Sequence, residues 1–161
     1  MPPAGEEWLR AAHERGLGEA LLFSGTLPAQ ALSDALAACR VLLFPDRAGP
    51  QSRKGSLAGA MASGRPVVAL DGPRTWEELI AAQAVRVVAP RAEALAQAIG
   101  SLLADEGLAD ALGARGRAFA SDRMGLRVTA EAVKRLLEQL AGARGGRAQG
   151  RSSLHAEAAS S

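Results

Sequence analysis

QSRKGSLAGAMASGRPVV, residues 51–68, contains a polar turn, a helix of small residues and the start of a strand. The turn is basic and contains a glycine, the helix is expected to end at Gly64, and the strand is expected to begin at Pro66. Just before this stretch, the apolar run 41–44 predicts another strand, which ends at Pro45. The order strand, basic turn, helix, strand is typical of open parallel sheets, which bind ligands where their strands end.

The turn before this helix is the first candidate site. The first turn of a helix presents unpaired backbone N–H groups and the positive end of the helix dipole, which suit an anion such as phosphate. Arg53 and Lys54 add two full charges there, and Gly55 and Ser56 would contribute backbone N–H groups. Neither the P-loop spacing nor the GxGxxG fingerprint is present, so a solvated loop remains the alternative to the predicted phosphate site.

The composition is that of one globular domain with tails. The chain has 161 residues, 48% of them hydrophobic, and a chain of this length buries about two thirds of its unfolded surface. Because it has no Tyr and only three Phe and two Trp, its core must rely on Leu, Val and Ala. With 19 basic against 17 acidic residues and few aromatic side chains for base stacking, general nucleic-acid binding is rejected.

The residues that usually bind metals are scarce and scattered. Cys39 is the only cysteine, so an intramolecular disulfide and a cysteine-rich zinc site are both excluded, and a buried structural thiol is favoured over a nucleophile. His13 and His155 lack partners for catalysis or metal binding, so we expect neither a metal nor a cofactor. Residues 1–5 lack the apolar stretch of a signal peptide, and no apolar run approaches the length of a membrane span. We expect a cytoplasmic protein.

Strands and helices are predicted to alternate along the chain. Strands are expected over residues 20–24, 41–44, 67–70 and 85–88, and helices over residues 6–15, 28–39, 56–63, 75–83, 92–104, 108–120 and 126–140. Thr75 and Glu78 have the spacing of a capping box at the start of one helix. The predicted fold is α/β, a Rossmann-like parallel sheet flanked by helices, over residues 1–141. Residues 142–161, rich in Gly, Ala, Ser and Arg, are predicted to be a disordered tail.

Several of these segments resemble one family in the same order. Residues 23–27 (FSGTL), 41–45 (VLLFP), 60–69 (AMASGRPVVA) and 112–117 (LGARGR) are similar to blocks of the donor-binding, C-terminal domain of retaining GT-B glycosyltransferases of family 4, the glycosyl transferase group 1 type. The block at 60–69 is the most specific of them. The resemblance implies a partial GT-B domain that binds a nucleotide-diphosphate sugar for retaining hexosyl transfer.

The candidate site departs from the family pattern at two positions. The family usually carries one glutamate that positions the donor sugar and a second that holds the nucleotide ribose, and these fall on Gln51 and Gly59. Residues 52–57 instead resemble a divergent branch with the loop S-x-R-x-G-(S/T)-L, in which the basic loop would contact the donor diphosphate. Gln51 is then a candidate for a sugar hydroxyl, and Ser52 and Ser56 are candidates either for a hydroxyl donor or for the helix N-cap.

A second departure concerns what is missing. The family's acceptor domain and the strand, helix and strand that open its donor domain have no counterpart in the sequence, which would leave an exposed sheet edge. Residues 1–19 or a partner would cover this edge, or the chain is a gene fragment. We expect a second domain or chain to supply the acceptor half and the isolated chain to be inactive.

Two other functions remain as alternatives to a glycosyltransferase donor half. A non-catalytic nucleotide-binding or protein-interaction module would explain Gln51 and Gly59, because such a module would not need the two glutamates. A flavodoxin-like phosphate-binding regulator would be expected to have an acidic cluster, which the sequence lacks.

Trp76 could shield the site, but core packing is favoured. Arg65 is expected to be simply exposed in a turn.

Overall fold

The computed structural model describes residues 5–140, and these divide into two compact units at Ala35 and Leu36. The first unit contains α1 (Glu6–Glu14), the short 3-10 helix η1 (Gly18–Ala20) and most of α2 (Ala29–Ala38). The second unit contains the sheet and the remaining helices, and it carries the candidate site.

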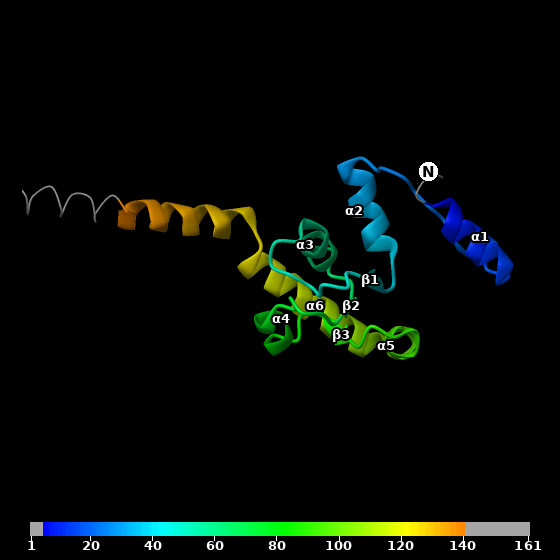
Figure 1. The fold of residues 1–161 in the computed structure, drawn as a ribbon. Helices are drawn as coiled ribbons and strands as arrows, with labels where there is room; N and C mark the ends of the chain where they lie inside the picture. Colours follow the sequence, from blue (N-terminus) through cyan, green and yellow to red (C-terminus); the bar gives the residue numbers. More distant parts are fainter. Residues whose placement is uncertain (1–4, 141–161) are drawn as a thin grey trace, which may run out of the picture. The chain divides into compact units, whose positions relative to one another are not determined.

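The second unit alternates strands and helices in the predicted order (Figure 1). Its elements are β1 (Leu42–Phe44), α3 (Gly55–Ala62), β2 (Val67–Leu70), α4 (Glu77–Ala81), β3 (Arg86–Val88), α5 (Ala92–Ala104) and α6 (Glu106–Arg123), and residues 126–140 are also helical. The strands form a parallel sheet in the order β1-β2-β3, with Leu42 opposite Val67 and Val68 opposite Arg86.

Helices cover both faces of this sheet because successive side chains of β2 point to opposite sides. Val67 and Ala69 join a buried cluster with Leu57 and Met61 of α3. Val68 lies in a second cluster with residues of α5 and the first half of α6. The strands therefore lie between α3 and α5 (Figure 1), and the expected α/β, Rossmann-like parallel sheet is confirmed.

The prediction of a strand at residues 20–24 is wrong. Residues 18–20 form η1, and residues 21–25 have no regular structure, so the sheet within residues 5–140 has three strands instead of four. Leu22 is 89% exposed and Phe23 is 47% exposed. The apolar run was the only signal for this strand. An apolar segment forms a strand only where a neighbouring strand pairs with its backbone, and the composition of the segment does not provide that neighbour.

The capping box predicted at Thr75 is also wrong. The N-cap residue of α4 is Trp76, and no side chain caps this helix. The Thr75 hydroxyl is used elsewhere, because it donates a hydrogen bond to Asp71 Oδ1 at 2.8 Å and accepts one from the Gly72 N–H at 2.9 Å. Trp76 packs on the core as favoured, with its ring edge-on to Phe119 at a centroid distance of 4.9 Å.

The remaining expectations concern single residues and the chain end. Cys39 is half-buried against the first core cluster, and Arg65 is exposed. The predicted tail lies outside the described residues. Within residues 5–140, no helix is both long and apolar enough to cross a membrane.

Candidate functional site

The basic turn runs directly into α3, as the sequence predicts. The Lys54 N–H donates to the Gln51 carbonyl at 3.2 Å and closes the turn, and α3 begins at Gly55. No side chain caps α3, so neither Ser52 nor Ser56 has the capping role. The first intrahelical bond at this end joins the Ala58 N–H to the Lys54 carbonyl at 3.1 Å. The three preceding N–H groups of α3 therefore have no acceptor among residues 5–140.

The two cations of the turn have different surroundings. Arg53 is exposed and has no ion pair within the described part of the chain. The Lys54 ammonium lies 2.8 Å from Asp46 Oδ2, and Asp46 Oδ1 accepts a hydrogen bond from the Ala48 N–H at 2.9 Å. The Lys54 hydrogen bond, with a smaller contribution from Ala48, lowers the pKa of Asp46. Lys54 is thus already paired, and a bound anion would have to share it.

Asp46 is a residue that the sequence analysis missed. It follows Pro45 at the carboxyl end of β1, which is the end of a parallel strand where ligand-binding residues gather. That position was the available signal. Its pairing with Lys54 could not be read from the sequence, because the intervening residues form a loop whose path depends on the neighbouring β2 loop.

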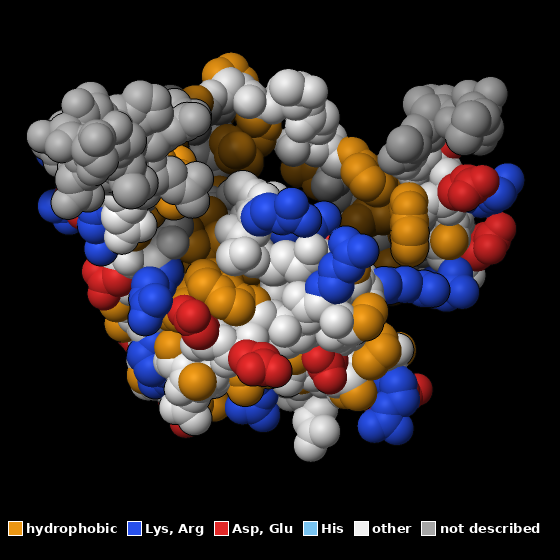
Figure 2. Space-filling view, turned by 60° about the vertical axis from the view of Figure 1, so that its left-hand side comes forward, with side chains coloured by type: hydrophobic (Ala, Val, Ile, Leu, Met, Phe, Trp, Pro, Cys, Tyr) orange, Lys and Arg blue, Asp and Glu red, His pale blue; other side chains and the backbone are white. Residues whose placement is uncertain are grey.

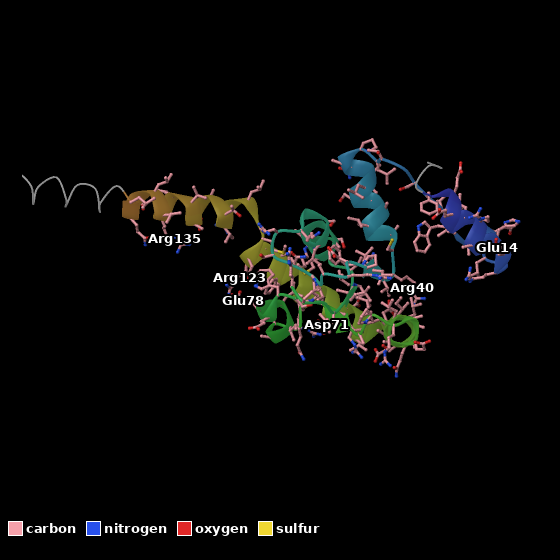
Figure 3. All side chains as sticks on the ribbon, viewed as in Figure 1. Glu14, Arg40, Asp71, Glu78, Arg123 and Arg135 are labelled. Atoms are coloured by element: carbon pink, nitrogen blue, oxygen red, sulfur yellow. The ribbon has the colours of Figure 1, made fainter. Side chains whose placement is uncertain are left out.

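Two loops interlock to hold this site, one after β1 (residues 46–50) and one after β2 (residues 71–76). The Arg74 N–H donates to the Ala48 carbonyl and the Trp76 N–H donates to the Pro50 carbonyl, both at 2.9 Å. A Cβ on Gly72 would collide with backbone atoms of residues 47–49, so only glycine allows this approach. Asp71 lies where β2 ends (Figure 3), and its carboxylate fixes the second loop through Gly72 and Thr75.

The structure brings the six predicted site residues into one turn and helix start. Gln51 and Lys54 are half-buried, and the other four are exposed, namely Ser52, Arg53, Gly55 and Ser56. Gly59 is exposed in α3, one turn beyond Gly55, and a Cβ at this position would meet no atom within 4 Å. The helix start is therefore open to solvent and to an anion of the size of a phosphate.

Asp46→Asn should make the stability of the protein less dependent on acid pH. Because the folded-state pKa of Asp46 is lowered from its ordinary value of 3.8, its ion pair stabilises the fold above that value. This contribution is lost as the pH falls through the folded-state pKa. Urea unfolding of both proteins between neutral pH and pH 3 should show a difference near neutrality that narrows below about pH 4. A difference that stays constant with pH would contradict the assignment.

Charge and possible metal ligands are spread over the described surface. Figure 2 shows hydrophobic, basic and acidic side chains interspersed on the face in view. Among residues 5–140, no group of three or more His, Cys, Asp and Glu could hold a metal ion. The candidate site therefore consists of a helix start, Arg53 and the Lys54–Asp46 pair.

Two solved structures resemble the chain over most of its length. Sucrose-phosphate synthase from Thermosynechococcus elongatus matches 86% of the chain with a TM-score of 0.73 and 28% sequence identity. HepE from Anabaena, in complex with UDP, matches 85% of the chain with a TM-score of 0.70 and 20% identity. This chain spans 34% of the first structure and 38% of the second. No curated protein matches it.

The sequence match extends over both the strands and the candidate site. Residues 2–105 match the family described as glycosyl transferases group 1, and this range is more than half of the 161 residues. It includes β1, the basic turn, α3 and β2. The structural matches agree with it, since both are to GT-B glycosyltransferases, and the expected resemblance to a GT-B glycosyltransferase domain is confirmed. The chain belongs to the glycosyl transferases group 1 family.

Proposed function

We propose that this chain is the donor half of a glycosyltransferase and binds a nucleotide-diphosphate sugar at the start of α3. The observation that carries the proposal is the uncapped helix start directly after a basic turn, at the carboxyl end of β1. In doubly wound sheets, ligands bind at this end of the strands. The UDP bound to the structurally similar HepE supports a nucleotide as the ligand.

The diphosphate would contact α3 through its backbone. The N–H groups of Gly55 and Ser56, both exposed residues, lack acceptors among the described residues and can donate to phosphate oxygens. Arg53 would add a forked guanidinium and Lys54 a point charge, released in part from Asp46. In a retaining transfer, the same groups would stabilise the negative charge that develops on the departing nucleoside diphosphate. Ser52 and Ser56 would contribute hydroxyl donors, and Gln51 would hydrogen-bond the sugar.

Gly59→Glu should raise the affinity for a nucleoside diphosphate by about tenfold. The family resemblance places the ribose-holding glutamate here, and helical side chains lean towards the N-terminus, which is where the diphosphate would lie. A charge-assisted hydrogen bond to a ribose hydroxyl contributes about 1.5 kcal/mol, or roughly tenfold. Since a Cβ at position 59 meets no atom within 4 Å, the new side chain has room.

Calorimetry with UDP, GDP and ADP, and with pyrophosphate as the ligand without ribose, tests the Gly59→Glu prediction. Gly59→Ala is the matched control, because it raises helix propensity without adding a carboxylate. The gain should appear for a nucleoside diphosphate and be absent for pyrophosphate. Equal affinities of the Glu and Ala variants would contradict the placement of the ribose.

The acceptor half is proposed to come from a second domain or chain, and an added strand of the donor domain would complete the sheet beside β1. The Leu42 N–H donates to the Pro66 carbonyl at 2.9 Å and therefore points towards β2. Because backbone groups alternate along a strand, the N–H and C=O of Leu43 point away from β2, where no strand lies within residues 5–140. The Leu43 side chain is 46% exposed. An added strand would satisfy these backbone groups and cover Leu43.

The decisive experiment is calorimetric titration of the purified chain with UDP, GDP and ADP and with their sugars. Saturable binding of one nucleotide would support the donor half and identify its base. Absence of binding by a chain shown to be folded would refute it. Sugar transfer by the chain alone, with a nucleotide sugar and an acceptor, would refute the proposal that another segment is needed for catalysis.

A non-catalytic module is the second candidate, and Gln51 and Gly59 favour it because the family's glutamates are absent. Such a module would keep the fold and bind a nucleotide or a protein partner without transferring sugar. Nucleotide binding that persists while no transfer occurs, even after a matching acceptor half is added, would support this candidate over the enzyme.

A further inference from the structure

A cavity of about 240 Å³ lies beside β3, away from the loops that follow β1 and β2. It is bordered by the turn between α4 and β3, the end of α5 and the first half of α6. Val85, Leu102 and Leu112 form an apolar floor, each at most 5% exposed. Ile80 and Leu108 line it as well, and they remain 49% and 37% exposed. Large apolar side chains thus face solvent around a preformed hollow.

Two arginine residues also line this cavity. Arg86 opens β3 and Arg115 lies in α6, and both side chains are exposed. Neither forms an ion pair with any residue in the range 5–140. Arg115 is held in place, because its Nε donates to the Gln83 carbonyl at 3.1 Å. The cavity therefore combines two cations that have no carboxylate partner with an apolar floor.

Gln83 provides a separate observation. It ends α4 in a Schellman motif, in which the Ala84 N–H donates to the Leu79 carbonyl at 3.1 Å and the Gln83 N–H donates to the Ile80 carbonyl at 2.9 Å. This motif requires a left-handed residue, usually glycine, and Gln83 has a φ of 48°. Gln83 thus has a side chain at a position where glycine would be unstrained, and this residue lines the cavity. Strained residues of this kind concentrate at ligand sites.

We propose that this cavity is a second binding site and that its ligand is a short aliphatic carboxylate. The carboxylate pairs with the guanidinium groups of Arg86 and Arg115, whose forked donors match its two oxygens, and the Gln83 amide adds a further donor. The aliphatic chain lies on the apolar floor and covers the exposed parts of Ile80 and Leu108. The ligand is short because the cavity is smaller than the roughly 300–1,000 Å³ of pockets for drug-sized molecules.

The class of ligand is inferred from the residues that line the cavity, and the inference does not depend on the proposed nucleotide site. An inorganic anion would leave Ile80 and Leu108, the exposed apolar residues of the lining, in water, and a neutral alkyl chain would leave both cations without a carboxylate partner. The cavity lies where β3 begins, whereas Arg53 and Lys54 lie beyond the end of β1. Failure of either proposal would therefore leave the other intact.

The test is titration of the purified full chain with octanoate, followed by calorimetry and by backbone amide shifts. Octanoate should bind at one saturable site and shift the amides of residues 80–87. Octanol, which has the chain without the charge, and acetate, which has the charge without the chain, should each bind at least about tenfold more weakly. Absence of saturable octanoate binding, or equal binding of octanol, would overturn the proposal.

Three variants and a control locate the site. Arg86→Gln and Arg115→Gln should each weaken octanoate binding by about tenfold, and Gln83→Gly should weaken it less while keeping the left-handed turn. Arg91→Gln is the matched control, because Arg91 is exposed and does not line the cavity. If Arg115→Gln does not fold, Arg86→Gln still tests the location of the site, because it replaces an exposed side chain. Octanoate affinity unchanged in Arg86→Gln would overturn the assignment.

Discussion

Replacing Arg53 and Lys54 together with alanine should lower the affinity for a nucleoside diphosphate by about 100-fold. Each cation would make a charge-assisted contact to phosphate, and we take about 1.5 kcal/mol each because both side chains are partly or fully exposed. The sum of about 3 kcal/mol corresponds to roughly two orders of magnitude. Calorimetry with the nucleotide that binds the unmodified chain measures the effect.

Lys134→Ala/Arg135→Ala is the matched control for this pair. It removes two adjacent exposed cations from the helix at residues 126–140, which is not part of the candidate site, and should leave the affinity unchanged. Equal losses in the two double variants would show that net charge alone drives binding. A loss below about threefold in the Arg53/Lys54 variant would contradict the proposed diphosphate contact.

The affinity lost in the Arg53/Lys54 double variant includes an effect of Asp46 as well as the loss of the Lys54 contact. Without the Lys54 ammonium, the Asp46 carboxylate would repel the diphosphate, so part of the loss belongs to Asp46. Asp46→Asn should therefore raise nucleotide affinity when Lys54 is present, because the ammonium no longer has to be shared. Combining Asp46→Asn with Lys54→Ala in a double-mutant cycle isolates the direct contribution of Lys54.

Gly72→Ala should destabilise the protein by about 3 kcal/mol and reduce nucleotide binding in the fraction that folds. The new methyl group would collide with the backbone of residues 47–49, which cannot rotate away as a flexible side chain could. The two loops would separate, and the bonds from Arg74 to Ala48 and from Trp76 to Pro50 would weaken. Urea unfolding measures the loss of stability.

Gly100→Ala is the control for the glycine substitution itself. Gly100 is exposed within α5 and a Cβ there meets no atom within 4 Å, so alanine should stabilise the protein by about 1 kcal/mol through helix propensity. The two substitutions add the same methyl group with opposite expected signs. A Gly72→Ala protein as stable as the unmodified chain would show that the loops are not interlocked.

The fold was largely predictable wherever local signals and neighbouring strands agreed. The strands at β1, β2 and β3 were expected from apolar runs, and each has a partner in the sheet. The same kind of run at residues 20–24 failed because no partner strand lies beside it in the described structure. The Thr75 capping box failed in a similar way, since Asp71 and Gly72 bind the hydroxyl that would have capped α4.

The candidate site was predictable in position but not in its interactions. Residues 51–56 form one turn and helix start as expected, because the turn and the helix are contiguous in sequence. The pairing of Lys54 with Asp46 was missed, as was the interlocking of the two loops. These contacts join segments that are separated in sequence and are neighbours because β1 and β2 pair side by side.

The sequence by itself determined the order of strands and helices from β1 onwards, the basic turn before α3 and the membership of a glycosyltransferase family. Each of these depends on residues that are adjacent in the chain or on motifs that can be matched directly. Only the tertiary structure decided which strand lies at the sheet edge, how Lys54 is neutralised and that Arg86 and Arg115 share an apolar cavity. The reason is physical: these features depend on backbone hydrogen bonds and packing between residues far apart in sequence.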